Sequence, residues 1–286
     1  MTRQPNFSDV WIKVERAKEH VSNLEALVER FLHPEPQPEP YRVLRYCDLD
    51  TGDLVFKVKA SGQPPLWWSA ILGDAIHNLR SSLDLLVCEL VRAEGNKVGE
   101  GTKFPMFRSA ASFANAFNPG PPGAIKGAPQ RAIDLIKAAQ PYKGANNVFW
   151  RLHQLDIVDK HKLLVPVGMA QGAIIHDLTR MVANNPDLAD GLTTAQPLTT
   201  PADISTTERQ FPLEDGTVIY RVPARGREDV MSQMHMHPEF TFEVAFGEGE
   251  VVKGEPLVQT LHELVQFVEG YIKRFPPLFI SQTGPP

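Results

Sequence analysis

The stretch "SAILGDAIHNLRSSLDLLVCELVRA", residues 69–93, decides the fold, because it repeats like a buried helix and yet carries charged side chains. Leucine and isoleucine recur at steps of three and four, which places them on one face of a helix with about 3.6 residues per turn. This apolar stripe consists of Leu72, Ile76, Leu79, Leu83, Leu86 and Leu90. The segment therefore predicts a core helix, with Ser69 as its N-terminal cap and Gly95 just after its end.

A second column on the same predicted helix is polar. His77, Arg80 and Asp84 also step by three and four, and they stack beside the apolar stripe. Val87 and Val91 continue this column, so we expect it to be half buried rather than fully hydrated.

A helix predicted over residues 146–162 offers partners for this column. Asp156 and Asp159 lie on its apolar face, and an isolated buried carboxylate is very costly. The nearest positive groups by pattern are His77 and Arg80. We therefore expect the two helices to pack with His77 and Arg80 against the two aspartates, and both aspartates to be mostly buried.

Two interpretations of the polar cluster require no metal ion. In the first, the protein is a non-enzymatic interaction or scaffold protein, and the cluster is a structural network that only fixes the register of two helices. A functional site would use His77 for acid–base chemistry, or would bind a phosphate-bearing ligand with Arg80. The candidate catalytic residues are His77, Arg80, Asp84, Asp156 and Asp159, flanked by His153 and Lys160.

In the third interpretation, the cluster binds a metal ion and the protein is a metal-dependent hydrolase. The oxygen and nitrogen ligands would come from Asp74, His77, Asp156, Asp159 and His161. Di-metal helical bundles use paired Glu-x-x-His motifs, which this sequence lacks, and Arg80 would add a competing positive charge. We therefore expect no tightly bound transition metal and no cofactor.

Weaker candidates lie elsewhere in the chain. His235 and His237 would share one face of a strand, but no third metal ligand can be named. Cys88 lies near the polar column and is more typical of a buried structural thiol than of a catalytic Cys–His pair. The glycine motifs of dinucleotide sites, phosphate loops and nucleophile elbows are absent.

The remaining pattern predicts an α+β fold: a helical bundle core with an N-terminal β-hairpin and a small antiparallel sheet in the C-terminal part. Helices are predicted over residues 8–32, 69–93, 112–118, 129–140, 146–162 and 256–275. Strands are predicted over residues 41–47, 54–60, 163–170, 216–222 and 239–246, with a long loop over 180–210. We divide the chain into 1–40, 41–165 and 166–286, as parts of one integrated domain.

Composition indicates a soluble globular protein. The 286 residues are 42% hydrophobic and 22% charged, with a formal net charge of −5. No apolar run approaches the roughly 20 residues of a membrane span, the first residues lack a signal-peptide pattern, and two cysteines are too few for a disulfide framework. We therefore expect a cytoplasmic protein with no membrane partner. A nucleic-acid partner would have to use a local basic patch at 124–162.

Four strings carry a family resemblance: "WWSAILGDAIHNLRSSLDLLVCELV", "FP", "IDLIKAAQPY" and "WRLHQLDIVDKHKLL". Over residues 67–165 the chain resembles a bacterial and phage family of unknown function. It is more loosely similar to HEPN domains, helical bundles that often act as metal-independent ribonucleases and pair as homodimers. Their motif is an Arg followed after four to six residues by a His. Arg80 has no His at 85–87, so the resemblance implies a HEPN-like bundle with a broken ribonuclease motif.

Overall fold

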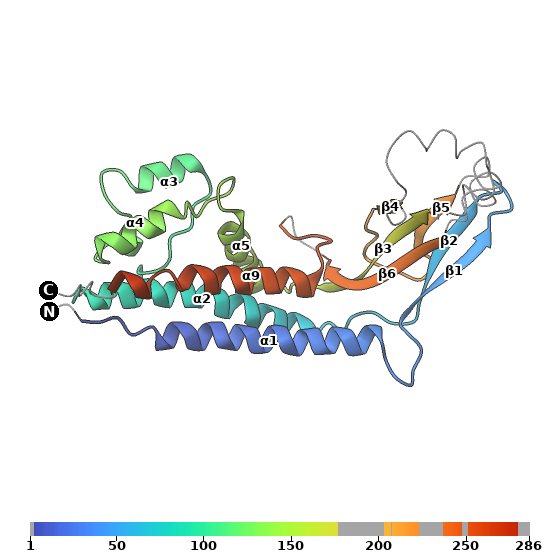
Figure 1. Ribbon diagram of the computed structural model, residues 1–286, viewed down its shortest axis with the longest axis horizontal. Coiled ribbons are helices and arrows are strands. Elements are labelled where there is room, and N and C mark those ends of the chain that lie inside the picture. The colour runs from blue at the N-terminus through green and yellow to red at the C-terminus, as the bar shows by residue number, and fades with distance from the viewer. Residues whose placement is uncertain (1–2, 177–202, 207, 223–236, 248–250, 280–286) are drawn as a thin grey trace, which may run out of the picture. The chain divides into compact units, whose positions relative to one another are not determined.

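The computed structural model describes residues 3–176, 203–206, 208–222, 237–247 and 251–279 (Figure 1). The chain divides into two compact units whose segments alternate along the sequence. The helical unit comprises residues 1–26, 66–165 and 248–286. The sheet unit comprises residues 27–65 and 166–247. The predicted α+β class is confirmed, and each unit is built around one of the two kinds of element.

The helices lie close to the ranges that the apolar periodicity predicts. They are α1 (Ser8–Leu32), α2 (Trp68–Ala93), α3 (Ala110–Ala116), α4 (Gln130–Ala138), α5 (Asn147–His161) and α9 (Leu257–Ile272). Two short 3-10 turns, η1 (Gly123–Ile125) and η2 (Pro276–Phe279), complete the described helical structure. All belong to the helical unit, except that the last turns of α1 belong to the sheet unit.

The helical unit is centred on α2, which packs against α5 and α9 (Figure 1). Every member of the predicted apolar stripe of α2 is completely buried. Burial of one leucine side chain stabilises a fold by about 1.5–3 kcal/mol, so this stripe is a large part of the core. Ion pairs from Lys18 to Glu269 (2.8 Å) and from His262 to Glu25 (3.2 Å) hold α1 beside α9.

The ends of α2 agree only in part with the predicted caps. Gly95 has a φ of 77° and follows the helix end, as predicted. Ser69 is not the N-terminal cap: the helix begins at Trp68, with Trp67 in the cap position and no side-chain cap bond. The Ser69 hydroxyl is buried and has no hydrogen-bond partner among the described residues. The prediction was wrong because the helix starts one residue earlier.

Among the residues that the structure describes, the sheet unit has two antiparallel sheets of three strands each. One has the order β1 (Tyr41–Cys47), β2 (Leu54–Ala60), β5 (Val218–Val222). The other has the order β4 (Asp203–Thr206), β3 (Pro166–His176), β6 (His237–Phe246). The β1–β2 hairpin is confirmed, but β5 extends it to a sheet. Strand β4 lies within the predicted 180–210 loop, most of which is outside the described residues.

Aromatic side chains join the two sheets. Phe56 contacts Phe240, and Tyr41 contacts Phe242, in each case with ring centroids 5.6 Å apart. Gly168 of β3 lies beneath Tyr41, where a β-carbon would overlap the phenol ring. The sheet unit therefore has its own aromatic core.

None of the described helices is both long enough and apolar enough to span a membrane.

Candidate functional site

The α2–α5 contact depends on a glycine in α2. A β-carbon at Gly73 would overlap the carboxylate of Asp159, so only glycine lets α5 approach this closely. One turn further along α2, His77 meets Asp156 of α5. The predicted packing of the polar column against the two aspartates is therefore correct for His77.

Both oxygens of the Asp156 carboxylate are engaged. Its Oδ1 lies 3.1 Å from Nδ1 of His77, and its Oδ2 accepts a 2.6 Å hydrogen bond from Nζ of Lys160. Asp156 is 3% exposed, as the sequence predicts. Its contacts with His77 and Lys160 offset the free-energy cost of burying the carboxylate. The carboxylate is thus fixed and holds the imidazole from one side.

The other ring nitrogen of His77 faces a hydroxyl. Nε2 lies 3.3 Å from Oγ of Ser81, one turn further along α2. The His77 side chain is 52% exposed, so this end of the chain of contacts is open to solvent. Asp156, His77 and Ser81 therefore form a carboxylate–imidazole–hydroxyl series. Sequence reasoning missed Ser81, although its i, i+4 spacing from His77 was a usable signal.

Arg80 does not contact either aspartate of α5, and that prediction was wrong. Its guanidinium donates to Oδ1 of Asp84 (2.6 Å) and to the carbonyl of Phe104 (3.0 Å). Asp84 also accepts the Phe104 backbone N–H at 2.8 Å. The arginine is neutralised by the carboxylate one turn along its own helix, and it fastens the loop at Phe104 to α2. At 5% exposure, Arg80 is not available to a phosphate.

Asp159 is only partly buried, which corrects the expectation that both aspartates are mostly buried. Burial, together with the negative charges of Asp156 and Asp74, raises the pKa of its carboxyl group above the usual value. It forms no ion pair within the described part of the chain. Asp159 is thus a packing partner of Gly73 rather than a member of the His77 series.

His153 lies near this cluster and stays neutral. Burial, helped by the positive charge of Arg80, lowers the pKa of the His153 imidazole to about 4. Its Nδ1 is buried with no hydrogen-bond partner among the residues that the structure describes. Protonating it would place a positive charge near that of Arg80 at a partly buried position.

This histidine should make the fold sensitive to acid. The unfolded chain binds a proton on His153 near pH 6.5, whereas the folded chain does so only near pH 4. Stability is therefore fully present above pH 6.5 and is lost as the pH falls toward 4. We expect His153→Gln to flatten the fall in melting temperature across this window. Calorimetry of both chains at matched pH values measures the difference, and parallel curves would contradict the assignment.

Metal-ligand chemistry finds little support in the described residues. Within them, no group of three or more His, Cys, Asp or Glu side chains is placed to hold a metal ion. His235 lies outside the described residues, and of the His237 side chain nothing is described. Cys88 contacts the Thr102 carbonyl (3.7 Å), and burial raises the pKa of its thiol.

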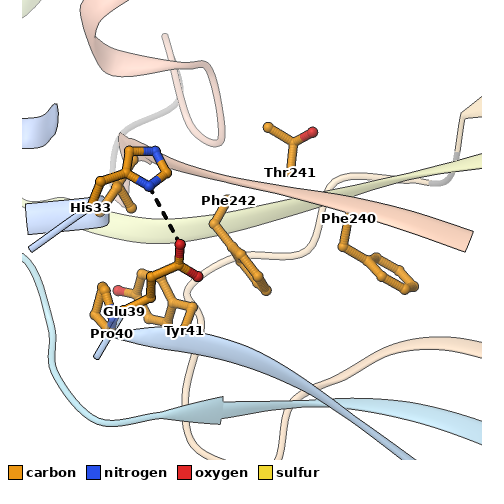
Figure 2. A pocket seen from close by; sticks show the side chains of 8 residues that line it. His33, Glu39, Pro40, Tyr41, Phe240, Thr241 and Phe242 are labelled. Atoms are coloured by element: carbon orange, nitrogen blue, oxygen red, sulfur yellow. Dashed lines mark ion pairs between the residues drawn. The ribbon is translucent and has the colours of Figure 1, made fainter. Parts of the chain in front are cut away.

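The sheet unit contains a separate cavity of about 290 Å³, shown in Figure 2. Its lining residues are Leu32, His33, Glu39, Pro40, Tyr41, Phe240, Thr241 and Phe242. His33 and Glu39 form an exposed ion pair of 3.5 Å there. The Tyr41 hydroxyl is sealed from solvent, so it offers no accessible proton donor. The described contacts of the His33–Glu39 pair include no hydroxyl that the imidazole could activate, so the His77 series is the stronger candidate site.

No protein-family model, curated protein or solved structure matches this chain.

Proposed function

We propose that the helical unit is a HEPN-like bundle carrying an acid–base site that hydrolyses carboxylic esters. Ser81 is the nucleophile, His77 the general base, and Asp156 the group that orients His77. The observation that supports this most is the contact series from the buried Asp156 carboxylate through the imidazole to the Ser81 hydroxyl. The structural half of the polar column is then Arg80 with Asp84.

The geometry places Nε2 of His77 to accept a proton from the Ser81 hydroxyl. A carboxylate at Nδ1 favours the tautomer with its proton on that nitrogen, which leaves the Nε2 lone pair facing the Ser81 hydroxyl. Ser81 Oγ attacks the ester carbonyl carbon as its proton passes to Nε2 of His77. His77 then gives this proton to the departing alcohol. A water molecule, losing a proton to Nε2 of His77, then attacks the acyl carbon; the bond to Ser81 Oγ breaks, the acid leaves, and His77 returns the proton to Oγ.

The substrate class follows from what surrounds the site. His77 is open to solvent, so an ester carried by a large molecule could reach Ser81. Phosphodiesters are less suited, because Arg80 is buried and held by Asp84 and Phe104. A metal-dependent hydrolysis has no ligand cluster among the described residues. We therefore favour acyl esters over phosphate esters.

A fluorophosphonate probe and a p-nitrophenyl ester test this proposal. We expect the probe to label Ser81, and Ser81→Ala to abolish both labelling and turnover. His77→Gln should lower turnover by about 100-fold or more, because general-base catalysis contributes about 10²–10⁴-fold. Ser82→Ala and His262→Gln are matched controls: Ser82 bonds the Leu79 carbonyl in the core, and His262 pairs with Glu25.

Melting temperatures separate this proposal from a purely structural network. His77 is half exposed, so His77→Ala should leave the melting temperature nearly unchanged while turnover is lost. A fall of several degrees without any measurable turnover in the wild type would instead favour the scaffold interpretation, in which the network only fixes helix register. Labelling that persists in Ser81→Ala would exclude Ser81 as the nucleophile.

A further inference from the structure

Residues 102–155 of the helical unit combine positive charge with partly exposed aromatic rings, and we propose that this surface binds single-stranded nucleic acid. Between residues 102 and 155 the sequence has seven Lys and Arg residues and one acidic residue, Asp134. Arg151 is neutralised by Glu255. The other six cations are exposed and form no ion pair within the described part of the chain. They are Lys103, Arg108, Lys126, Arg131, Lys137 and Lys143.

Four aromatic side chains gather within this segment outside the buried core. The Phe113 ring centroid lies 5.5 Å from that of Phe107, 4.9 Å from that of Phe117 and 5.1 Å from that of Tyr142. All four remain partly exposed, and α3, which carries Phe113, has no fully buried residue. The rings of the cluster thus pack on one another while each residue keeps part of its surface exposed.

A lysine ammonium group lies over each of two partly exposed rings. Lys137 Nζ is 5.6 Å from the Phe117 ring centroid, and Lys143 Nζ is 4.6 Å from that of Trp150. Trp150 is likewise only partly buried. We call the combined set the basic–aromatic surface. Its members are Phe107, Phe113, Phe117, Tyr142 and Trp150, with Arg108, Lys137 and Lys143.

The combination of cations and partly exposed rings favours single-stranded nucleic acid over other polyanions. Cations attract a phosphate backbone, and partly exposed rings offer platforms on which unpaired bases stack. A duplex hides its base faces, and inorganic polyphosphate has none, so neither partner would use the rings. Two of the cations lie over two of the rings, which fits a strand that presents phosphates and bases together. Ser81 and His77 are not members, so this proposal is independent of ester hydrolysis.

Fluorescence anisotropy of the full chain with a dye-labelled oligonucleotide of about 20 nucleotides tests the proposal, since sequence-tolerant sites cover about 4–16 nucleotides. We expect binding that weakens with salt, with a slope of log K against log salt near −2 for three cations on a single strand. Reversing the three cations should weaken binding at least tenfold. The variant is Arg108→Glu/Lys137→Glu/Lys143→Glu.

A matched triple variant controls for net charge. It changes the net charge equally but at exposed arginines of the sheet unit. The variant is Arg30→Glu/Arg42→Glu/Arg45→Glu. It should bind nearly as the wild type does, and an equal loss in both triple variants would overturn the proposal, because overall charge alone would then explain the binding.

The aromatic contribution has its own test. Phe117→Leu/Trp150→Leu keeps both side chains apolar but removes two stacking faces, so binding to the single strand should weaken about 30-fold or more. Binding to inorganic polyphosphate should not change. Equal affinity for a duplex of the same sequence, equal affinity for polyphosphate, or no binding at low salt would each overturn the proposal. Ser81→Ala should bind normally, so a failure of the hydrolase proposal leaves this one standing.

Discussion

Asp84→Ala is expected to lower the melting temperature of the helical unit by about 6–12 °C, since roughly 3 kcal/mol is lost at about 2–4 °C per kcal/mol. The variant leaves the guanidinium of Arg80, which is 5% exposed, without its carboxylate. It also removes the acceptor of the Phe104 N–H. We take the low end of the range for a broken buried pair because the Asp84 side chain is 36% exposed. Differential scanning calorimetry measures the effect.

Two further substitutions calibrate this result. Asp84→Asn keeps an oxygen that can accept from the Phe104 N–H but removes the negative charge, so its loss should be intermediate. Asp134→Ala removes an exposed carboxylate that only Gln130 contacts in the described structure, and it should change stability by less than about 0.5 kcal/mol. An Asp84→Ala chain that melts within 2 °C of the wild type would show that Arg80 is not held by this pair.

Periodicity along the chain predicts the elements well, because it reports which face of each element is buried. The stripe from Leu72 to Leu90 is buried as predicted, and the hairpin strands have the predicted bounds. Periodicity does not predict which elements that are distant in the sequence pair with each other. Strand β5 pairs with β2 from more than 150 residues away, and nothing in the alternation of either strand names the other.

Because periodicity does not identify distant partners, the contacts of the polar column were predicted only in part. Helical spacing correctly brought His77 to Asp156, because both lie on facing sides of long helices. It failed for Arg80, whose acceptors are Asp84 on its own helix and a carbonyl of the loop at Phe104. The course of that loop is not encoded in any periodic pattern. Ser81 belongs to neither the apolar stripe nor the predicted polar column, so the periodic pattern did not mark it.

Gly168→Ala is expected to destabilise the sheet unit by about 2–3 kcal/mol, at the upper end of the usual range for overpacking. The new methyl group would overlap the hydroxyl and ring of Tyr41. Tyr41 is 1% exposed and is held between Phe31 and Phe242, so its ring cannot swing away. A drop of roughly 5–10 °C in the melting temperature should follow. Thermal unfolding followed by near-ultraviolet circular dichroism, which reports on packed aromatic rings, measures it.

A double-mutant cycle with Tyr41→Phe shows whether the overlap is the cause. The Tyr41 hydroxyl is buried with no hydrogen-bond partner among the described residues, so removing it alone should cost little or even stabilise the unit. In the Gly168→Ala background it frees the space closest to the new methyl group and should recover part of the loss, giving a coupling of about 1 kcal/mol. Gly62→Ala is the matched control, because its methyl group would meet Phe31 at an ordinary 3.8 Å. Strict additivity of the two substitutions would mean that the methyl group at position 168 acts through something other than Tyr41.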